Sequence, residues 1–292
     1  MTVRVCINGD VLAPEEAKVS VFDRGFLYGD SVFEVMRTYS GKCFAEHEHL
    51  ERLARSAELV LISMPASLET LSEEIRRTLA AASNDESYVR VVVTRGQGPL
   101  TLDPGKARDP LRVIIVSPLP VPPPELYTEG ISACLVLSSR PTDYTRAAGA
   151  KASNYLANLL AAEEARRKGG QEAILTDSSG EILEGATSNV FVVRGGEVRT
   201  PPLELGILGG ITRAAVLSSA ARIGIAIRED SLFPNDLYDA EEVFLTSSIR
   251  EVAPVVRVDG RPIGDGRPGP ITRALHAAFL EDLRASLGIG PA

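Results

Sequence analysis

Lys151 is the residue whose surroundings in this sequence best suit it for chemistry. It lies in Gly149-Ala150-Lys151-Ala152-Ser153-Asn154-Tyr155, after small residues and just before an expected helix, and Tyr155 can reach the same pocket. Glu184 begins Glu-Gly-Ala-Thr-Ser-Asn between two strand-like segments, where an apolar setting obliges a carboxylate to find a partner. Most lysines are solvated surface charges, and that is the alternative for Lys151 taken alone.

Two further segments could bind an anion. The first is the glycine-rich run Leu-Gly-Ile-Leu-Gly-Gly-Ile-Thr-Arg at 205–213, which opens a helix whose first amides favour a phosphate. It matches neither a Walker loop nor a dinucleotide fingerprint. The second is Thr246-Ser247-Ser248, hydroxyls and amides at the end of an apolar strand. A structural turn and a solvated loop are the respective alternatives.

The elements that must position these residues follow from the hydrophobic pattern. Apolar runs predict strands or strand-like segments at 3–8, 19–22 and 31–39, the last ended by the turn Ser40-Gly41-Lys42. Helical spacing predicts helices at 47–61 and 68–82. Two β-branched runs, at 89–94 and 111–117, predict further strands of a sheet.

Five prolines between Pro118 and Pro124 exclude a helix or a central strand there and indicate a boundary. We therefore predict an N-terminal α/β domain at 1–120, a linker at 121–129 and a C-terminal domain at 130–292. In the latter we expect strands at 131–138 and 242–246, helices at 154–168 and 271–287, and hairpin turns at Gly195-Gly196 and Asp259-Gly260. Ile-Thr-Arg-Ala occurs at 211 and 271, each time opening a helix.

Composition bounds the class of protein. The 292 residues are 44% hydrophobic and 24% charged, enough for two compact α/β halves with buried cores. The net charge of −8, without a basic block, disfavours nucleic acid as a partner. The sequence suggests no secretory leader and no membrane span, so we expect a cytoplasmic protein. Three cysteines and three histidines suggest neither a disulfide framework nor a metal site.

Taken together, six segments resemble the class IV pyridoxal-phosphate enzymes, which comprise branched-chain aminotransferases, D-amino-acid aminotransferases and aminodeoxychorismate lyases. Any one is weak, but they occur in the family's order over nearly the whole chain: Tyr28-Gly-Asp-Ser-Val-Phe-Glu34, His49-Leu-Glu-Arg-Leu53, Lys151 to Tyr155, Glu184 to Asn189, Gly209 to Arg213 and Thr246 to Pro254. The resemblance implies an α/β (α+β), two-domain fold of fold type IV, like D-amino-acid aminotransferase. It also implies pyridoxal 5'-phosphate as cofactor, held between the domains, and a homodimer.

The resemblance assigns roles residue by residue. Lys151 would hold the cofactor as a Schiff base and carry the proton, Glu184 would face the pyridine nitrogen, and Tyr155 would hydrogen-bond the ring oxygen. The remaining residues expected to bind the cofactor, mainly through its phosphate, are Arg52, Ser188, Ile211, Thr212, Ser247 and Ser248. The residues expected to contact substrate are Tyr28, Phe33, Arg37, Tyr88, Arg90 and Ile249.

The branch of the family depends on the N-terminal half. Phe33, Leu100 and Leu102 stand where D-amino-acid enzymes carry a tyrosine and an Arg-x-His pair that bind the substrate carboxylate. Val35 replaces both the threonine usual in the lyases and the glycine usual in branched-chain enzymes. We expect ping-pong transfer from a branched-chain-like L-amino acid to 2-oxoglutarate, with Arg90 pairing the acceptor's second carboxylate.

Three alternatives stay open from the residues alone. The segment at 140–146 departs from the branched-chain pattern and could bind a carboxylate differently, so a D-amino-acid or (R)-amine transaminase is one. An aminodeoxychorismate lyase using the same Lys151 is the second. The third is a non-catalytic protein that binds phosphate ligands through the loop at 209–212.

Overall fold

The structure, a computed structural model, describes residues 2–138 and 145–290. The chain divides into two compact units. Unit 1 comprises Met1–Val121 with Ala150–Tyr155, and unit 2 comprises Pro122–Gly149 with Leu156–Ala292. Most of the segment at 140–146, whose departure from the branched-chain pattern left the D-selective alternative open, lies outside the described residues.

Unit 1 is built on a six-stranded antiparallel sheet in the order β2-β1-β6-β5-β3-β4. Its strands are β1 (Arg4–Ile7), β2 (Asp10–Leu12), β3 (Ser31–Tyr39), β4 (Lys42–Cys43), β5 (Ser87–Thr94) and β6 (Arg112–Pro118). The predicted strand at 31–39 is confirmed with both its bounds, and the predicted turn after it joins β3 to β4. The β-branched and apolar residues of β3, β5 and β6 supply most of the sheet's buried surface.

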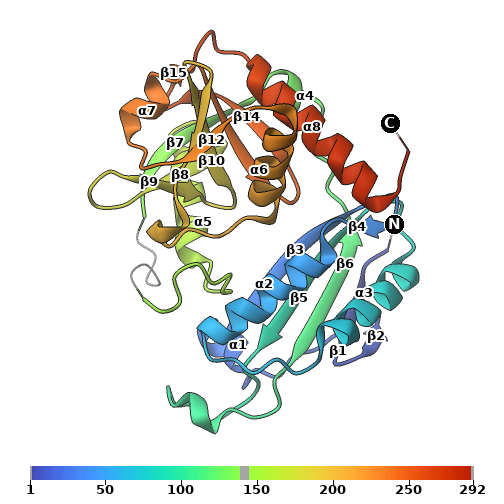
Figure 1. Cartoon of the computed structure of the whole chain (residues 1–292). Helices are drawn as coiled ribbons and strands as arrows, with labels where there is room; N and C mark the ends of the chain where they lie inside the picture. Colours follow the sequence, from blue (N-terminus) through green and yellow to red (C-terminus); the bar gives the residue numbers. More distant parts are fainter. Residues whose placement is uncertain (1, 139–144, 291–292) are drawn as a thin grey trace. The chain divides into compact units, whose positions relative to one another are not determined.

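Helices α2 (Glu46–Leu59) and α3 (Leu68–Ala82) pack against this sheet (Figure 1). Leu53, Leu71 and Ile75 of these helices are fully buried in one core with β-strand residues such as Val89 and Ile114, and Leu68 and Leu79 are partly buried against it. The helical spacing read from the sequence is therefore confirmed. Every fully buried aliphatic side chain here contributes about 1.5–3 kcal/mol relative to exposure, which makes this interface the core of unit 1.

One predicted strand is wrong. Residues 19–22 form a turn, in which the Phe22 amide donates to the Ser20 hydroxyl and the Asp23 amide to the Ser20 carbonyl, before α1 (Arg24–Tyr28) begins. The apolar side chains that suggested a strand are exposed rather than paired, 60% for Val21 and 54% for Phe22. An apolar run does not distinguish a buried strand from an exposed apolar surface.

Unit 2 contains a nine-stranded mixed sheet in the order β12-β11-β10-β13-β14-β7-β8-β9, with β15 paired to β14. Its strands are β7 (Ile131–Leu137), β8 (Glu172–Thr176), β9 (Ile182–Gly185), β10 (Asn189–Arg194), β11 (Glu197–Thr200), β12 (Ile227–Glu229), β13 (Glu242–Ser247), β14 (Glu251–Val258) and β15 (Arg261–Pro262). Both predicted hairpin turns are confirmed, Gly195-Gly196 between β10 and β11 and Asp259-Gly260 between β14 and β15.

The helices of unit 2 are α4 (Glu125–Thr128), α5 (Leu156–Arg167), α6 (Ile211–Ile223), α7 (Pro234–Tyr238) and α8 (Pro270–Leu287). Short 3₁₀ turns occur at Pro104–Lys106 in unit 1 and Leu203–Leu205 in unit 2. Both copies of Ile-Thr-Arg-Ala open a helix, α6 and α8, directly or one residue after a glycine. Glycine in a left-handed conformation ends each of the two, Gly224 and Gly288.

Residues 150–155 differ from expectation in where they pack. We expected them in the C-terminal domain, but they belong to unit 1 because their backbone pairs with β3. Within the described residues no helix is long and apolar enough to cross a membrane. The expected cytoplasmic location stays a prediction. The three cysteines are buried, as expected of small hydrophobic residues.

Candidate active site

One face of the unit 1 sheet gathers four of the predicted substrate residues. In the antiparallel pair of β3 and β5, Val35 lies opposite Arg90 and Arg37 lies opposite Tyr88. Residues directly opposite one another share a face, and alternate residues along a strand do too, so Phe33, Arg37, Tyr88 and Arg90 lie on the same face. Val35 is on that face as well. The other face carries residues such as Val32 and Met36, which pack in the core with the helices.

The segment that carries Lys151 runs alongside β3. The Phe33 amide donates to the Lys151 carbonyl at 2.9 Å, and the Ser153 amide donates to the Ser31 carbonyl at 2.9 Å. From the helix side, the hydroxyl of Ser56 on α2 accepts the Lys151 amide at 3.1 Å. Three hydrogen bonds therefore fix the backbone at the lysine.

The Lys151 side chain lies among aromatic rings. Its Nζ is 3.4 Å from the Tyr155 hydroxyl and 4.8 Å from the centre of the Phe33 ring. The Phe33 and Tyr155 rings meet edge to face at 5.1 Å, and the Arg90 guanidinium covers Phe33 at 3.8 Å. Among the described residues no carboxylate forms an ion pair with Lys151 or Arg90. Among the described residues the structure thus brings three predicted residues, Phe33, Arg90 and Tyr155, together at the amine of Lys151, which has no acidic partner there.

Arg52 belongs to a buried charge network behind this group. Its Nε and Nη2 donate to the two oxygens of Glu34 at 2.6 and 2.7 Å, and Nδ1 of His49 contacts the same carboxylate at 2.7 Å. Burial works to raise the pKa of Glu34, but the hydrogen bonds from Arg52 and His49 outweigh it and lower the pKa to about 2. Burial lowers the pKa of His49, which is therefore neutral near pH 7 and donates Nδ1–H.

Two predicted substrate residues have other neighbours. Tyr28 on α1 is 39% exposed and lies under the Arg24 guanidinium at 4.9 Å. Arg37 stacks over the Tyr39 ring at 4.3 Å, farther along β3 from Phe33. No contact described for Tyr28 joins it to Lys151. Their roles toward substrate stay predictions.

In unit 2, Glu184 on β9 is tied to the glycine-rich loop. Its Oε2 accepts the Leu208 amide at 3.1 Å and the side-chain amide of Asn189 at 3.4 Å. Asn189 also donates to the Leu208 carbonyl at 2.8 Å, so one asparagine joins the buried carboxylate to the loop. A Cβ on Gly210 would lie 2.0 Å from the Asn189 side-chain oxygen, which explains the glycine at this close approach.

The two copies of Ile-Thr-Arg-Ala differ in what their amides contact. At the start of α8, the Ile271 and Thr272 amides donate to the Glu242 carboxylate at 2.9 and 2.7 Å. At the start of α6, the amides of Ile211 and Thr212 have no acceptor within the described part of the chain. The start of α8 is therefore occupied by the carboxylate of Glu242, whereas the start of α6 is available for another anion.

Predicted cofactor residues also lie at the β10–β13 pair. Asn189 is opposite Thr246 in this pair, so Ser188 precedes β10 at the end where β13 leads into Ser247 and Ser248. The hydroxyls of Ser188 and Thr246 are buried and have no hydrogen-bond partner among the described residues. Buried hydroxyls are normally paired, so these two suit a polar ligand or water.

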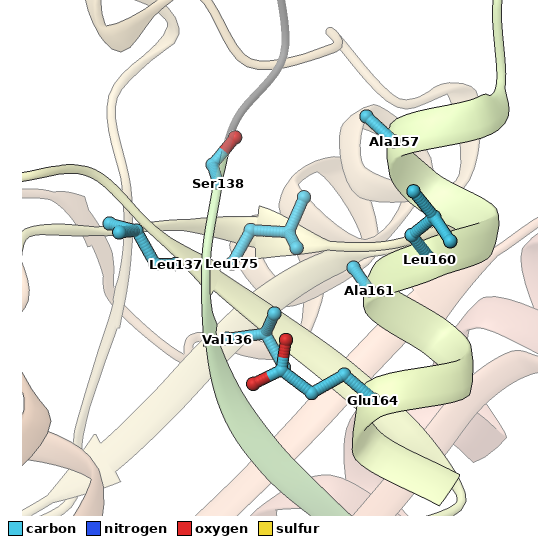
Figure 2. A pocket seen from close by; sticks show the side chains of 8 residues that line it. All are labelled: Val136, Leu137, Ser138, Ala157, Leu160, Ala161, Glu164 and Leu175. Carbon is cyan, nitrogen blue, oxygen red and sulfur yellow. The ribbon is translucent and has the colours of Figure 1, made fainter.

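A small cavity elsewhere in unit 2 is not this site. It measures about 70 Å³ and lies between β7, β8 and α5, with α5 side chains facing the strands (Figure 2). Its lining residues are Val136, Leu137, Ser138, Ala157, Leu160, Ala161, Glu164 and Leu175. Ligand pockets are typically some hundreds of Å³, and none of the predicted site residues lines this one.

Comparison with known proteins identifies the family. The model of the family described as amino-transferase class IV matches residues 31–258, more than half of the chain. The chain belongs to the class IV aminotransferases. A relative in Methanocaldococcus jannaschii, provisionally named a branched-chain-amino-acid aminotransferase, is 40% identical over 288 residues and 98% of both chains. The D-alanine aminotransferase of Listeria monocytogenes is 33% identical over 290 residues, again 98% of both.

Solved structures agree with this membership. The crystal structure of the Escherichia coli branched-chain amino acid aminotransferase has a TM-score of 0.90 at 35% identity, covering 95% of this chain and 93% of that one. The branched-chain aminotransferase of the archaeon Thermoproteus uzoniensis, solved with norvaline, has a TM-score of 0.88 at 33% identity, covering 97% and 95%. The expected fold-type IV architecture and aminotransferase class are confirmed.

Four residues of this aminotransferase were not assigned roles from the sequence. Glu34, His49 and Ser56 support Arg52 and Lys151, and Asn189 supports Glu184. A signal for two of them exists in the sequence, because His49, Arg52 and Ser56 recur at i, i+3 and i+7 on the otherwise apolar face of one helix. Polar residues on a buried face must have partners.

The Glu34 network predicts how stability depends on pH. Glu34 stabilises the fold above its unfolded pKa, and this contribution of about 3 kcal/mol is lost as the pH falls toward 2. Buried neutral His49 acts in the same direction, since the unfolded chain takes up its proton below about pH 6.5. We expect the free energy of unfolding, measured by urea titration, to fall from pH 7 to pH 3.

The Glu34→Gln variant should be less stable at pH 7 and should lose less stability on acidification. Glu48→Gln, at an exposed position of α2, the helix that carries His49 and Arg52, is the control and should keep the wild-type dependence of stability on pH. If the free energy of unfolding of Glu34→Gln fell between pH 5 and pH 3 as steeply as that of wild type, the assignment would be contradicted.

Proposed function

We propose that this aminotransferase moves the amino group of an L-amino acid with a branched aliphatic side chain to 2-oxoglutarate, with pyridoxal 5'-phosphate bound through Lys151. The observation that carries the proposal is the Lys151 group. The Lys151 amine has no acidic partner among the described residues and is bordered by Tyr155 and Phe33, and three hydrogen bonds hold the backbone of its segment, so it is arranged to bind a carbonyl compound rather than to balance a charge.

Each unit contains groups of the kinds that would bind the cofactor. The Ile211 and Thr212 amides at the α6 start, with Ser247 and Ser248, offer the uncharged donors that a phosphate takes, and Arg52 would add a charge. The buried hydroxyl of Ser188, which has no hydrogen-bond partner in the described part of the chain, supports a polar ligand here. Glu184, held by Leu208 and Asn189, is the acidic group to face the pyridine nitrogen.

The chemistry follows from these groups. When bound, the cofactor supplies an electron sink for the carbon that loses its proton. Lys151 Nζ would take the proton from the α-carbon of the amino donor and, in the second half of the cycle, would deliver a proton to the α-carbon derived from the 2-oxo acid. Tyr155 would orient the ring through its hydroxyl. Glu184 would keep the proton on the pyridine nitrogen.

Substrate choice is argued from the sheet face that carries Phe33. Val35 and the Phe33 ring are the apolar part of this face, which also carries Arg37 and Arg90, and that part suits an aliphatic side chain. Arg90 has an aromatic neighbour and no ion pair among the described residues, so its guanidinium suits the second carboxylate of 2-oxoglutarate. Leu100 and Leu102, 72% and 79% exposed, offer no charged group for a D-amino-acid carboxylate.

We also propose that the enzyme is a homodimer through unit 1. Phe22 and Phe26 are 54% and 71% exposed, and the strongly exposed Leu100 and Leu102 follow Gly98, whose amide donates to the Phe22 carbonyl. The Arg24 side chain further joins α1 to the Thr101 carbonyl at 2.7 Å. Large apolar side chains gathered in one place favour association.

The cofactor assignment predicts a visible absorption band in wild-type protein loaded with pyridoxal phosphate, bleached by borohydride. Lys151→Ala should lose the band, because it removes the amine proposed to bind the carbonyl. Lys168→Ala, an exposed lysine paired with Glu164, is the control and should keep it. A wild-type protein that remains colourless after loading would refute the proposal.

The substrate assignment predicts that Arg90→Met raises the KM for 2-oxoglutarate about ten- to a hundredfold, the usual loss for a charge-assisted hydrogen bond. Its half-reaction with L-leucine, which lacks a second carboxylate, should change little. Arg76→Met, at an exposed position on α3, should alter neither value.

Half-reactions also separate the branches of the family. Wild type should react with L-leucine, and slowly or not at all with D-alanine, D-glutamate or (R)-1-phenylethylamine. A fast reaction with one of the latter three and none with L-leucine would establish the D-amino-acid or (R)-amine alternative. Release of pyruvate from an aminodeoxychorismate-like substrate without an amino acceptor would establish the lyase.

The dimer proposal predicts twice the chain mass for wild type in light scattering. Phe26→Asp combined with Leu102→Asp should shift the mass toward that of one chain, since two charges would be desolvated in the interface. Val121→Asp, an exposed apolar position away from this surface, should leave the dimer intact. A monomeric wild type would refute the proposal.

A further inference from the structure

The hairpin that presents Ser247 and Ser248 has an unusually demanding backbone. Ser247 at the end of β13 pairs with Glu251 at the start of β14, so three residues, Ser248, Ile249 and Arg250, form the loop. The Arg250 amide donates to the Ser247 hydroxyl at 3.3 Å across the loop. Glu251 has φ of 55°, a left-handed conformation that costs free energy for a residue other than glycine. Contacts from other segments are therefore needed to hold this loop in one conformation.

The first restraint comes from Arg250. Its Nη2 donates to Oε2 of Glu172 and also contacts the Thr187 hydroxyl at 3.3 Å. Glu172 is the first residue of β8 and its side chain is only 6% exposed. Thr187 belongs to the turn between β9 and β10, next to Ser188. One guanidinium therefore joins the Ser247–Ser248 loop to a strand and to the turn that carries a third predicted cofactor residue.

The second restraint holds the strained residue itself. His276 on α8 contacts Oε2 of Glu251 through Nε2 at 2.7 Å, and its ring stacks on Tyr127 at 4.7 Å. The same helix is fixed at its first turn by Glu242 of β13, through the Ile271 and Thr272 amides. The end of the hairpin is thus held from both sides by charged or aromatic contacts.

We propose that Arg250 and Glu172 are positioning residues, which hold the Ser247–Ser248 loop and the Ser188 turn in the geometry that binds the cofactor phosphate. Neither touches the reacting atoms. A partly buried ion pair contributes little net stability after desolvation, whereas its geometry constrains both segments that it joins. The inference rests on the proposed function, because it requires that these serines bind that phosphate.

The test compares pyridoxal phosphate with pyridoxal, which lacks the phosphate. Dissociation constants of the two ligands are measured by absorption titration on the full-length wild type, Arg250→Met, Glu172→Gln and the double variant. We expect the dissociation constant for pyridoxal phosphate to rise about tenfold or more in each variant, as it does when a supporting partner is lost. The dissociation constant for pyridoxal should stay unchanged. The double variant should lose no more than the Arg250→Met variant, because both changes remove one interaction.

Two controls separate positioning from general destabilisation. Arg228→Met removes an exposed arginine that pairs with Glu197 in the same unit, and it should leave both affinities unchanged. Arg250→Lys, which keeps the charge but not the fork, should recover part of the loss. The inference would be overturned if Arg250→Met lowered the affinities for both ligands equally, or lowered neither. Wild type that binds pyridoxal phosphate no tighter than pyridoxal would overturn the proposed phosphate site, and the inference with it.

Discussion

The arrangement of the active-site group in unit 1 depends on the pairing of the Lys151 segment with β3. Six residues that are distant in sequence from unit 1 pack with it, because the Phe33 amide and the Ser31 carbonyl bond to that segment's backbone. The same hydrogen bonds determine where the lysine side chain begins, and the rings of Phe33 and Tyr155 are its neighbours. A flexible lysine has many rotamers, so fixing its backbone and bordering it with rings limits the positions of its amine.

Three buried carboxylates, one in unit 1 and two in unit 2, are each held by hydrogen-bond donors of their own unit. Glu34 is ionised deep in unit 1 because Arg52 and neutral His49 donate to it. Glu184 and Glu242 in unit 2 are instead held by backbone amides, those of Leu208 and of the first turn of α8. Such partners offset a desolvation cost that would otherwise exclude a carboxylate from the interior. Arg90 and Lys151, which are half-buried, instead have aromatic rings as neighbours and form no ion pair with a carboxylate among the described residues.

The two helix starts with identical sequence show how tertiary structure distinguishes local motifs. Ile-Thr-Arg-Ala opens α6 and α8 after the same kind of glycine turn, and both helices offer their first amides. Glu242 reaches the start of α8 from β13, which makes that motif purely structural. Nothing in the four residues predicts this difference, because the acceptor comes from a strand that ends more than twenty residues away in sequence.

The sequence by itself determined the spacing of apolar residues along each helix and strand, the glycine turns between these elements and the order of the six motifs. These are local properties, so the bounds of β3 and α3 and the family could be predicted from residue types and spacing alone. Only the tertiary structure decided that residues 150–155 pack with unit 1, that residues 19–22 form an exposed turn, and that Arg52, His49 and Glu34 form one network. Each of these depends on hydrogen bonds or burial set by the surrounding fold, and composition and periodicity carry no record of which distant partner a polar group will find.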